Sequence, residues 1–255
     1  MNALRAVWRL LRALLHAIGG LATILWIFPR LDVPGRHARV QAWARKMLAV
    51  LGIGLQVRGV PAPHGPMLLV ANHVSWLDIL VMHAARHCRF VSKAEVRHWP
   101  LIGTLATGAG TLYIERKSRR DALRVVHEMA ARLQAGDVLA VFPEGTTSDG
   151  VDLLPFHANL IQAAVAADAP AQPVALQFLD AATGRPSVTA AYIGDDTLVA
   201  SLWRTVSGPP ITATVSFGEP QRVGTRDRRA WAADLQEAVR ALRAPPGSCR
   251  KPELP

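Results

Sequence analysis

The sequence predicts an α/β fold in which helices flank a mixed, largely parallel sheet. Short apolar runs rich in β-branched residues alternate with helical patterns along most of the chain. Several of these runs end in polar residues that are followed by helix-start signals. Half of the 255 residues are hydrophobic, which provides a large core. We therefore expect a helical N-terminal region over 1–52, an α/β domain over 53–244 and a loose, proline-rich tail over 245–255.

The N-terminal region is expected to form two amphipathic helices. In the first, polar side chains recur every three or four residues and share one stripe: Arg5, Arg9, Arg12 and His16. Apolar side chains occupy the other side: Leu4, Val7, Leu11, Leu14, Leu15 and Ile18. The second helix, over 36–50, has its own apolar stripe: Val40, Trp43, Met47, Leu48 and Leu51. Basic amphipathic helices bind membrane surfaces, and Trp8 and Trp26 suit the headgroup boundary.

The apolar length of this region decides between lying in a bilayer and crossing it. The apolar stretch 13–28, broken only by His16 and Thr23, is shorter than the roughly 18 to 20 residues that a span requires. We therefore expect the first helix to lie in the membrane interface. A short or tilted span, and a helix packed on the core with a solvated basic face, are the alternatives.

The α/β domain is expected to contain eight strands, since short apolar runs are bounded there by Gly, Pro and polar turn residues. They cover 56–59, 67–71, 89–92, 111–115, 137–142, 172–178, 187–193 and 211–217. Helices are expected after Ser75, from Ser118 to just before Gly136, and over 158–167 and 226–243. The helix that Ser118 caps should bury four side chains: Leu123, Val126, Ala130 and Leu133.

The stretch from Asn72 to Asp78 follows the most apolar of these strands. Ser75 with Asp78 three residues later is typical of a capped helix start, so His73 lies in the turn between strand and helix. The turn lets the side chains of His73 and Asp78 approach, and a histidine with a carboxylate partner can act as a general base. A capping role for Asp78 alone explains the spacing equally well, so both interpretations stay open at this point.

Two further strands end in polar groups, Glu115-Arg116 and Glu144-Gly145-Thr146. Ligands of open α/β sheets bind at such strand ends. Because the sequence has no Gly-x-Ser-x-Gly elbow, a nucleophile would come from the substrate, as a hydroxyl that His73 deprotonates. Glu144 as a plain helix-start residue, and the basic residues around Arg116 as a solvated helix start, are the alternatives.

The net charge of +10 indicates an anionic partner. Much of the basic charge lies on helices with apolar faces, and no nucleic-acid motif is present, so anionic membrane lipid is favoured over nucleic acid. Cys88 and Cys249 form no disulfide framework, which indicates a reducing compartment. The histidines show no metal-ligand arrangement.

Four segments resemble, in order, the motifs of the glycerolipid acyltransferases. Asn72–Asp78 resembles the His-x4-Asp motif, Gly110–Arg116 the second motif, Phe142–Thr146 the third and Gln172–Leu176 the fourth. The resemblance extends over 57–220 and is to the bacterial 1-acylglycerol-3-phosphate acyltransferases in particular. It favours the catalytic interpretation of His73 and implies a glycerol-3-phosphate acyltransferase-like fold.

The resemblance implies that His73 activates an acceptor hydroxyl against an acyl thioester, from acyl-CoA or acyl carrier protein, and that Asp78 orients it. It implies acceptor-binding roles for five residues: Lys93, Arg116, Glu144, Gly145 and Thr146. Arg116 would contact the phosphate of 1-acyl-sn-glycerol-3-phosphate, and acylation at the sn-2 hydroxyl would give phosphatidic acid. No cofactor or metal is expected. The paired N-terminal helices are a monotopic anchor in some members, which places the chain at the cytoplasmic face of the inner membrane.

One departure from the family pattern concerns the acceptor. Many phosphate-acceptor members have Arg directly after the third motif, where this chain has Thr147. That change removes one phosphate ligand, so another lysolipid, such as lyso-ornithine lipid, is the alternative acceptor. A non-catalytic lipid-binding protein is the alternative from a different class.

Overall fold

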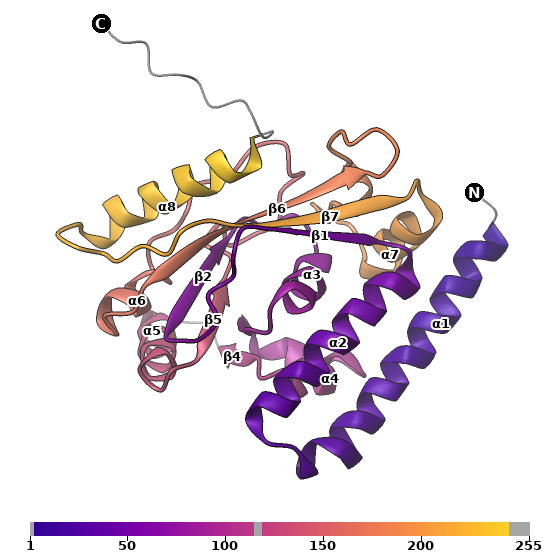
Figure 1. The fold of residues 1–255 in the computed structure, drawn as a ribbon, viewed down its shortest axis with the longest axis horizontal. Coiled ribbons are helices and arrows are strands. Elements are labelled where there is room, and N and C mark those ends of the chain that lie inside the picture. Colours follow the sequence, from indigo (N-terminus) through magenta and orange to yellow (C-terminus); the bar gives the residue numbers. More distant parts are fainter. Residues whose placement is uncertain (1–2, 115–118, 245–255) are drawn as a thin grey trace, which may run out of the picture.

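The computed structural model describes residues 3–114 and 119–244. Within them, seven strands form one sheet in the order β1-β7-β6-β2-β5-β3-β4 (Figure 1). The strands are β1 (Gly54–Arg58), β2 (Met67–Ala71), β3 (Arg89–Lys93), β4 (Leu112–Ile114), β5 (Val138–Val141), β6 (Ala171–Asp180) and β7 (Ile211–Phe217). All neighbours are parallel except β6 and β7, which are antiparallel. The expected mixed, largely parallel sheet is therefore confirmed.

Helices cover both faces of this sheet (Figure 1). They are α1 (Ala3–Ala22), α2 (Val33–Leu51), α3 (Leu77–Ala85), α4 (Ile102–Gly108), α5 (Arg119–Gln134), α6 (Gln162–Ala166), α7 (Leu198–Ser207) and α8 (Arg228–Arg243). Every residue of β2 is buried because parallel strands are covered on both faces. Leu69 and Ala71 join the apolar cluster of α2 and α3, whereas Leu68 and Val70 join that of α5 and α8.

The outward face of α1 is apolar. The six side chains expected on that face, from Leu4 to Ile18, are all 46–81% exposed, and Trp8 and Trp26 are exposed too. The buried positions of α1 are the small residues Ala6, Ala17 and Gly20. Gly20 lies so close to Trp43 of α2 that a Cβ at position 20 would be 2.6 Å from its indole nitrogen.

The polar stripe of α1 is divided between protein and surroundings. Arg9 donates to the carbonyl of Val206 on α7, and His16 bonds to the carbonyl of Trp43 on α2, while Arg5 and Arg12 stay exposed. The helix also continues through a π-helical turn (Thr23–Ile27) and a 3-10 turn (Phe28–Arg30). The segment Ala3–Arg30 is long and apolar enough to cross a bilayer by length and composition, and an 18-residue window of it has a mean hydropathy of 1.8. The helical segment is thus longer than the apolar stretch 13–28, and both a tilted span and a position in the interface fit its length.

Two expected elements differ from those in the structure. Residues 187–193 form no strand, because Arg204 of α7 binds the carbonyls of Thr189 and Ala191 that a neighbouring strand would need. The segment holds a 3-10 turn (Val188–Ala190) instead. The expected helix over 158–167 is shortened to α6.

In α5 the buried face runs through Val125, Met129 and Leu133, so Leu123 is 63% exposed rather than buried. Helix α7 was not predicted; the side chain of Thr197 caps it by accepting from the Ala200 amide. Gly136 ends α5 as expected, in a left-handed conformation with φ of +87°. Ser118, the expected cap of α5, lies outside the described residues.

Candidate active site

Asn72 attaches the end of β2 to β6. Its side-chain nitrogen donates to the carbonyl of Leu176 at 3.0 Å, and its side-chain oxygen accepts from the Leu176 amide at 2.7 Å. Asn72 is 1% exposed, so a residue unable to make both bonds would leave buried backbone groups without partners. An amide fits this position because it carries one donor and one acceptor.

His73 and Asp78 are brought together as predicted. Nδ1 of His73 lies 2.7 Å from Oδ2 of Asp78. The carboxylate is fully buried, whereas the imidazole is 21% exposed. Since an ionised carboxylate can only accept, Nδ1 carries the proton and Nε2 is the acceptor atom of the ring. The arrangement therefore gives His73 a basic nitrogen on the side away from Asp78.

The same carboxylate also stabilises the start of α3. Oδ2 of Asp78 accepts from the backbone amides of Val74 at 2.7 Å and Ser75 at 2.9 Å. The Ser75 hydroxyl accepts from the Leu77 amide at 3.3 Å. The capping and the general-base interpretations are thus compatible, because one oxygen serves both.

An aromatic ring sets the plane of the imidazole. His73 stacks on Phe142, which follows β5, with ring centroids 4.0 Å apart and an interplanar angle of 6°. Phe142 stacks in turn on Phe90 of β3 at 5.7 Å. Stacking on Phe142 therefore fixes the plane of the His73 ring, and the contact of Nδ1 with Asp78 fixes its rotation.

Glu144 lies beside this pair in a buried position. It is 4% exposed, and among the described residues neither carboxylate oxygen has a hydrogen-bond partner. Burial raises the pKa of Glu144 to about 7, and the nearby backbone of His73 and the guanidinium of Arg243 offset only part of that rise. Glu144 is therefore a carboxyl group that titrates near neutral pH next to the catalytic candidate.

Gly145 and Thr146 turn away from Glu144 and are exposed. Gly145 has a φ of +74°, which favours glycine, and its amide donates to the carbonyl of Phe142 at 3.1 Å. The chain then returns to the His73 turn, where the Ser148 amide donates to the His73 carbonyl at 2.9 Å. The hydroxyl of Thr147 donates to the carbonyl of Tyr192, so this side chain is engaged by the protein.

Lys93 is the exposed last residue of β3, and it pairs in register with Ile114, the last residue of β4. Because β2, β5, β3 and β4 are parallel, their carboxyl ends share one edge of the sheet. Lys93 thus lies on the same edge as His73, although β5 separates their strands and no hydrogen bond joins them in the described part of the chain. Arg116 lies outside the described residues.

The remaining histidines are not arranged as metal ligands: within 3–114 and 119–244, no three His, Cys, Asp or Glu residues could hold a metal ion. His37 and His87 stack at 3.8 Å, and His83 lies 5.4 Å from His87. Burial lowers the pKa of His83 to about 4 and that of His87 to about 3. The trio is a neutral packing cluster between α2 and α3.

Sequence reasoning missed the contributions of Asn72, Phe142 and Ser148. The amide chemistry of Asn72 was a usable signal, since a buried Asn at a strand end needs backbone partners. Phe142 and Ser148 gave no such signal, because their contacts depend on how the β5 loop returns to the β2 turn.

Comparison with known proteins agrees with this geometry. A family model described as Acyltransferase matches residues 54–177. The chain is 39% identical to a lyso-ornithine lipid O-acyltransferase of Pseudomonas aeruginosa, over 94% of each chain, and 40% identical to a 1-acyl-sn-glycerol-3-phosphate acyltransferase of Neisseria gonorrhoeae, over 81% of each. The crystal structure of the 1-acyl-sn-glycerophosphate acyltransferase PlsC from Thermotoga maritima shares the fold, with a TM-score of 0.66 at 20% identity over 92% of this chain and 96% of that one. The chain is therefore an enzyme that belongs to the acyltransferase family, of the lysophospholipid type.

Proposed function

We propose that this chain transfers a fatty acyl group from acyl-CoA or acyl carrier protein to the hydroxyl of a lysolipid at the membrane, with His73 as general base. The observation that carries the proposal is the 2.7 Å contact between Nδ1 of His73 and the buried Asp78 carboxylate. It leaves Nε2 as a base on a ring that is 21% exposed. His73 and Asp78 are the catalytic residues of this proposal.

In the reaction, Nε2 of His73 takes the proton of the acceptor hydroxyl as its oxygen attacks the thioester carbonyl. The carbon–sulfur bond then breaks, and the imidazolium returns the proton to the departing thiolate. Asp78 stabilises the imidazolium between these steps. The products are an ester and a free thiol, so atoms and charge balance without a further reactant.

The proposed acceptor is 1-acyl-sn-glycerol-3-phosphate, acylated at its sn-2 hydroxyl to phosphatidic acid. Lys93 and Arg116 would hold its phosphate, since Lys93 ends β3 and Arg116 follows β4 in the sequence, and a fixed cation is the partner that phosphate prefers. Glu144, Gly145 and Thr146 would shape the same acceptor site.

A second acceptor, lyso-ornithine lipid, is favoured by a specific observation. Position 147 is Thr147, and its hydroxyl is bound to the Tyr192 carbonyl, so this position contributes no cation toward a phosphate. The relative from Pseudomonas aeruginosa, named a lyso-ornithine lipid O-acyltransferase, is similar over almost the whole chain.

The membrane part of the proposal is supported by α1. Its exposed apolar face, with Leu4, Val7 and Leu15 each more than half exposed, has no protein partner in the described part of the chain. Burying such a face in a bilayer would remove it from water, and the net charge of +10 would favour anionic lipid. We place the enzyme at the cytoplasmic face of the inner membrane, where thioester donors are made.

Thiol release tests the function. The purified full chain is assayed with palmitoyl-CoA and palmitoyl carrier protein, each against lysophosphatidic acid and lyso-ornithine lipid. We expect lysolipid-dependent thiol release that His73→Ala lowers at least 1,000-fold, whereas His64→Ala, at an exposed histidine, leaves it unchanged. Full turnover in folded His73→Ala would contradict the mechanism, and the better acceptor decides between the two lysolipids.

A further inference from the structure

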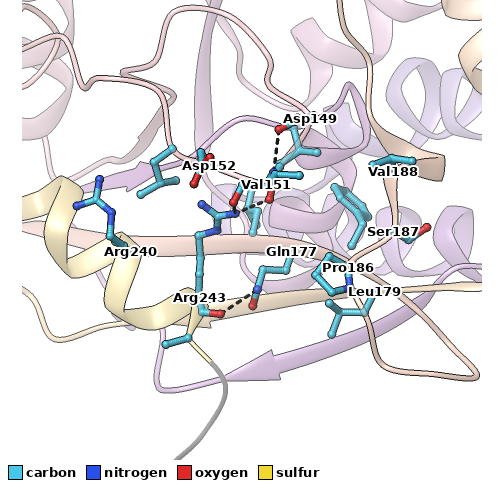
Figure 2. Close-up of a pocket in the computed structure, with 16 residues that line it drawn as sticks. Asp149, Val151, Asp152, Gln177, Leu179, Pro186, Ser187, Val188, Arg240 and Arg243 are labelled. Atoms are coloured by element: carbon cyan, nitrogen blue, oxygen red, sulfur yellow. Dashed lines mark hydrogen bonds between the residues drawn. The ribbon is translucent and has the colours of Figure 1, made fainter. Parts of the chain in front are cut away.

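A cavity of about 330 Å³ lies beside the His73 turn, where β6 ends (Figure 2). Its walls are Val74, the loop 149–153, residues 176–179 of β6, the segment 186–188 and the C-terminal end of α8. None of the acceptor roles proposed above uses it. The cavity is therefore separate from the residues assigned to the acceptor.

The wall of this cavity is joined to the catalytic turn. Val74 follows His73 directly, and Gly150 packs so closely on it that a Cβ at position 150 would lie 3.2 Å from Cγ1 of Val74. The Ser148 amide, two residues earlier, donates to the His73 carbonyl at 2.9 Å. A ligand that fills the cavity thus lies one residue from the general base.

The cavity and the proposed acceptor site lie on opposite sides of β2. Strand β6, which forms the cavity floor, neighbours β2 on one side, while β5, β3 and β4 follow on the other. Lys93 ends β3, and the chain toward Arg116 continues from β4. His73 is therefore flanked by two separate approaches, as a reaction between two substrates requires.

The lining combines apolar and charged groups in separate places. Figure 2 shows Arg240 and Arg243 of α8 at one end, and Leu179, Pro186 and Val188 at the other. The guanidinium of Arg243 is fixed by the carbonyls of Gly150 and Val151.

Arg240 and Gln177 of the lining can both bind a ligand. Arg240 is 54% exposed, and within the described residues its only ion pair is with Glu237 of its own helix. The side-chain nitrogen of Gln177 donates to the Arg243 carbonyl at 3.0 Å, and its oxygen can accept from a ligand.

We propose that this cavity binds the 4′-phosphopantetheine arm of the acyl donor, which acyl-CoA and acyl carrier protein share. This inference rests on the proposed function. The phosphate lies at Arg240, the amides of the arm bond to groups such as Gln177, and the thioester reaches Val74 beside His73. At about 330 Å³ the cavity holds a slender arm but not an adenine nucleotide as well.

The charges of the lining argue against an alkyl chain as the occupant. Asp149, Asp152, Arg240 and Arg243 all contribute to the walls. An alkyl chain would remove these groups from water without offering them a hydrogen bond, which costs free energy. The amide-bearing arm offers both donors and acceptors.

Two variants and two matched controls test the site in the full chain. Arg240→Gln removes the phosphate partner, and Arg132→Gln is its control, an arginine of similar exposure that pairs with Glu128 on α5. Val151→Trp, at a 62% exposed lining residue, obstructs the cavity, and Val60→Trp, at a 79% exposed residue outside it, is its control. Thermal unfolding of each variant checks that it is folded.

The variants are assayed with palmitoyl-CoA, palmitoyl carrier protein and S-palmitoyl-N-acetylcysteamine, which lacks the phosphate. For Arg240→Gln we expect KM to rise about tenfold with the first two donors and to stay unchanged with the third. Its kcat should stay within twofold and its KM for the lysolipid should not change. Val151→Trp should also raise KM for both phosphate-bearing donors, and neither control should do so.

Four results would overturn the proposal. The donor KM could stay unchanged in both variants, or the lysolipid KM could rise instead. Val151→Trp could change the chain-length preference with the donor KM unaltered, or the KM could rise with palmitoyl-CoA alone, which would assign the site to the nucleotide. Calorimetric binding of CoA separates the two proposals. If no lysolipid is acylated but Arg240→Gln weakens CoA binding about tenfold, the proposed function fails and the donor site stands. If turnover is normal and Arg240→Gln changes neither CoA binding nor the donor KM, the proposed function stands and the donor site fails.

Discussion

Replacing Asp78 with asparagine should stop acyl transfer while the protein stays folded. The amides of Val74 and Ser75 and Nδ1 of His73 all point at the same atom, Oδ2 of Asp78, so the asparagine oxygen takes that place and keeps the three bonds. The new side chain carries no negative charge, however, and cannot stabilise the imidazolium that forms when Nε2 takes a proton. His73 would then lose most of its strength as a base.

The magnitude follows from what is lost and what is kept. General-base catalysis contributes about 10² to 10⁴ in rate, so kcat should fall by about 10³, which corresponds to roughly 4 kcal/mol of transition-state free energy. The free energy of unfolding should fall by only about 1–3 kcal/mol, because hydrogen bonds to a charged acceptor become bonds to a neutral one. Asp78→Ala should cost more stability, since it leaves two buried backbone amides without partners.

The assay combines thiol-release kinetics with urea unfolding on the same preparations. A kcat below about 1% of wild type, with KM for both substrates within threefold and a cooperative unfolding transition, supports the reasoning. If folded Asp78→Asn keeps more than a third of the wild-type kcat, the charge of Asp78 beside Nδ1 does not support His73 as a base and the argument from the 2.7 Å contact is refuted.

Four further predictions follow from buried groups and from the exposed helix. Burial raises the pKa of Glu144 from 4.5 to about 7, so the contribution of this carboxyl group to stability is complete below pH 4.5 and is lost as pH rises through 7. In urea unfolding, Glu144→Gln should therefore be up to about 3 kcal/mol more stable than wild type at pH 8 and equal to it at pH 4. The pKa of His87 is lowered from 6.5 to about 3, so stability should fall as pH drops below 6.5, by about 2 kcal/mol at pH 5, and His87→Gln should flatten that slope. Asn72→Ala should cost about 2–4 kcal/mol of unfolding free energy, because two buried β6 backbone groups lose their partners. Leu15→Glu, at a 59% exposed residue of α1, should reduce sedimentation with anionic vesicles, whereas Leu123→Glu, 63% exposed on α5, should not.

Local patterns alone predicted much of this molecule. Strand β2 was predicted with its observed bounds, because a short, wholly apolar run bounded by turn residues is typical of a buried strand. The apolar stripe of α2 is buried or half-buried as expected, since helical periodicity decides which side chains share a face. His73 and Asp78 were predicted to approach because a single turn separates them.

Contacts between distant segments could not be predicted in this way. No local pattern showed that residues 187–193 would be held by Arg204 instead of pairing as a strand. Nor did any indicate that Phe142 would stack under His73 or that Thr147 would bond to Tyr192, since each contact joins segments brought together only by the sheet order.

The sequence by itself therefore determined the strand–turn–helix unit that carries His73 and Asp78, because the neighbouring residues from Asn72 to Asp78 suffice to build it. The tertiary structure decided the surroundings of the His73 ring. Burial under other elements raises the pKa of Glu144, and the meeting of β6, α8 and the loop after β5 creates the cavity beside Val74. Desolvation and cavity shape depend on every segment that packs around a point, and a linear sequence does not specify which segments those are.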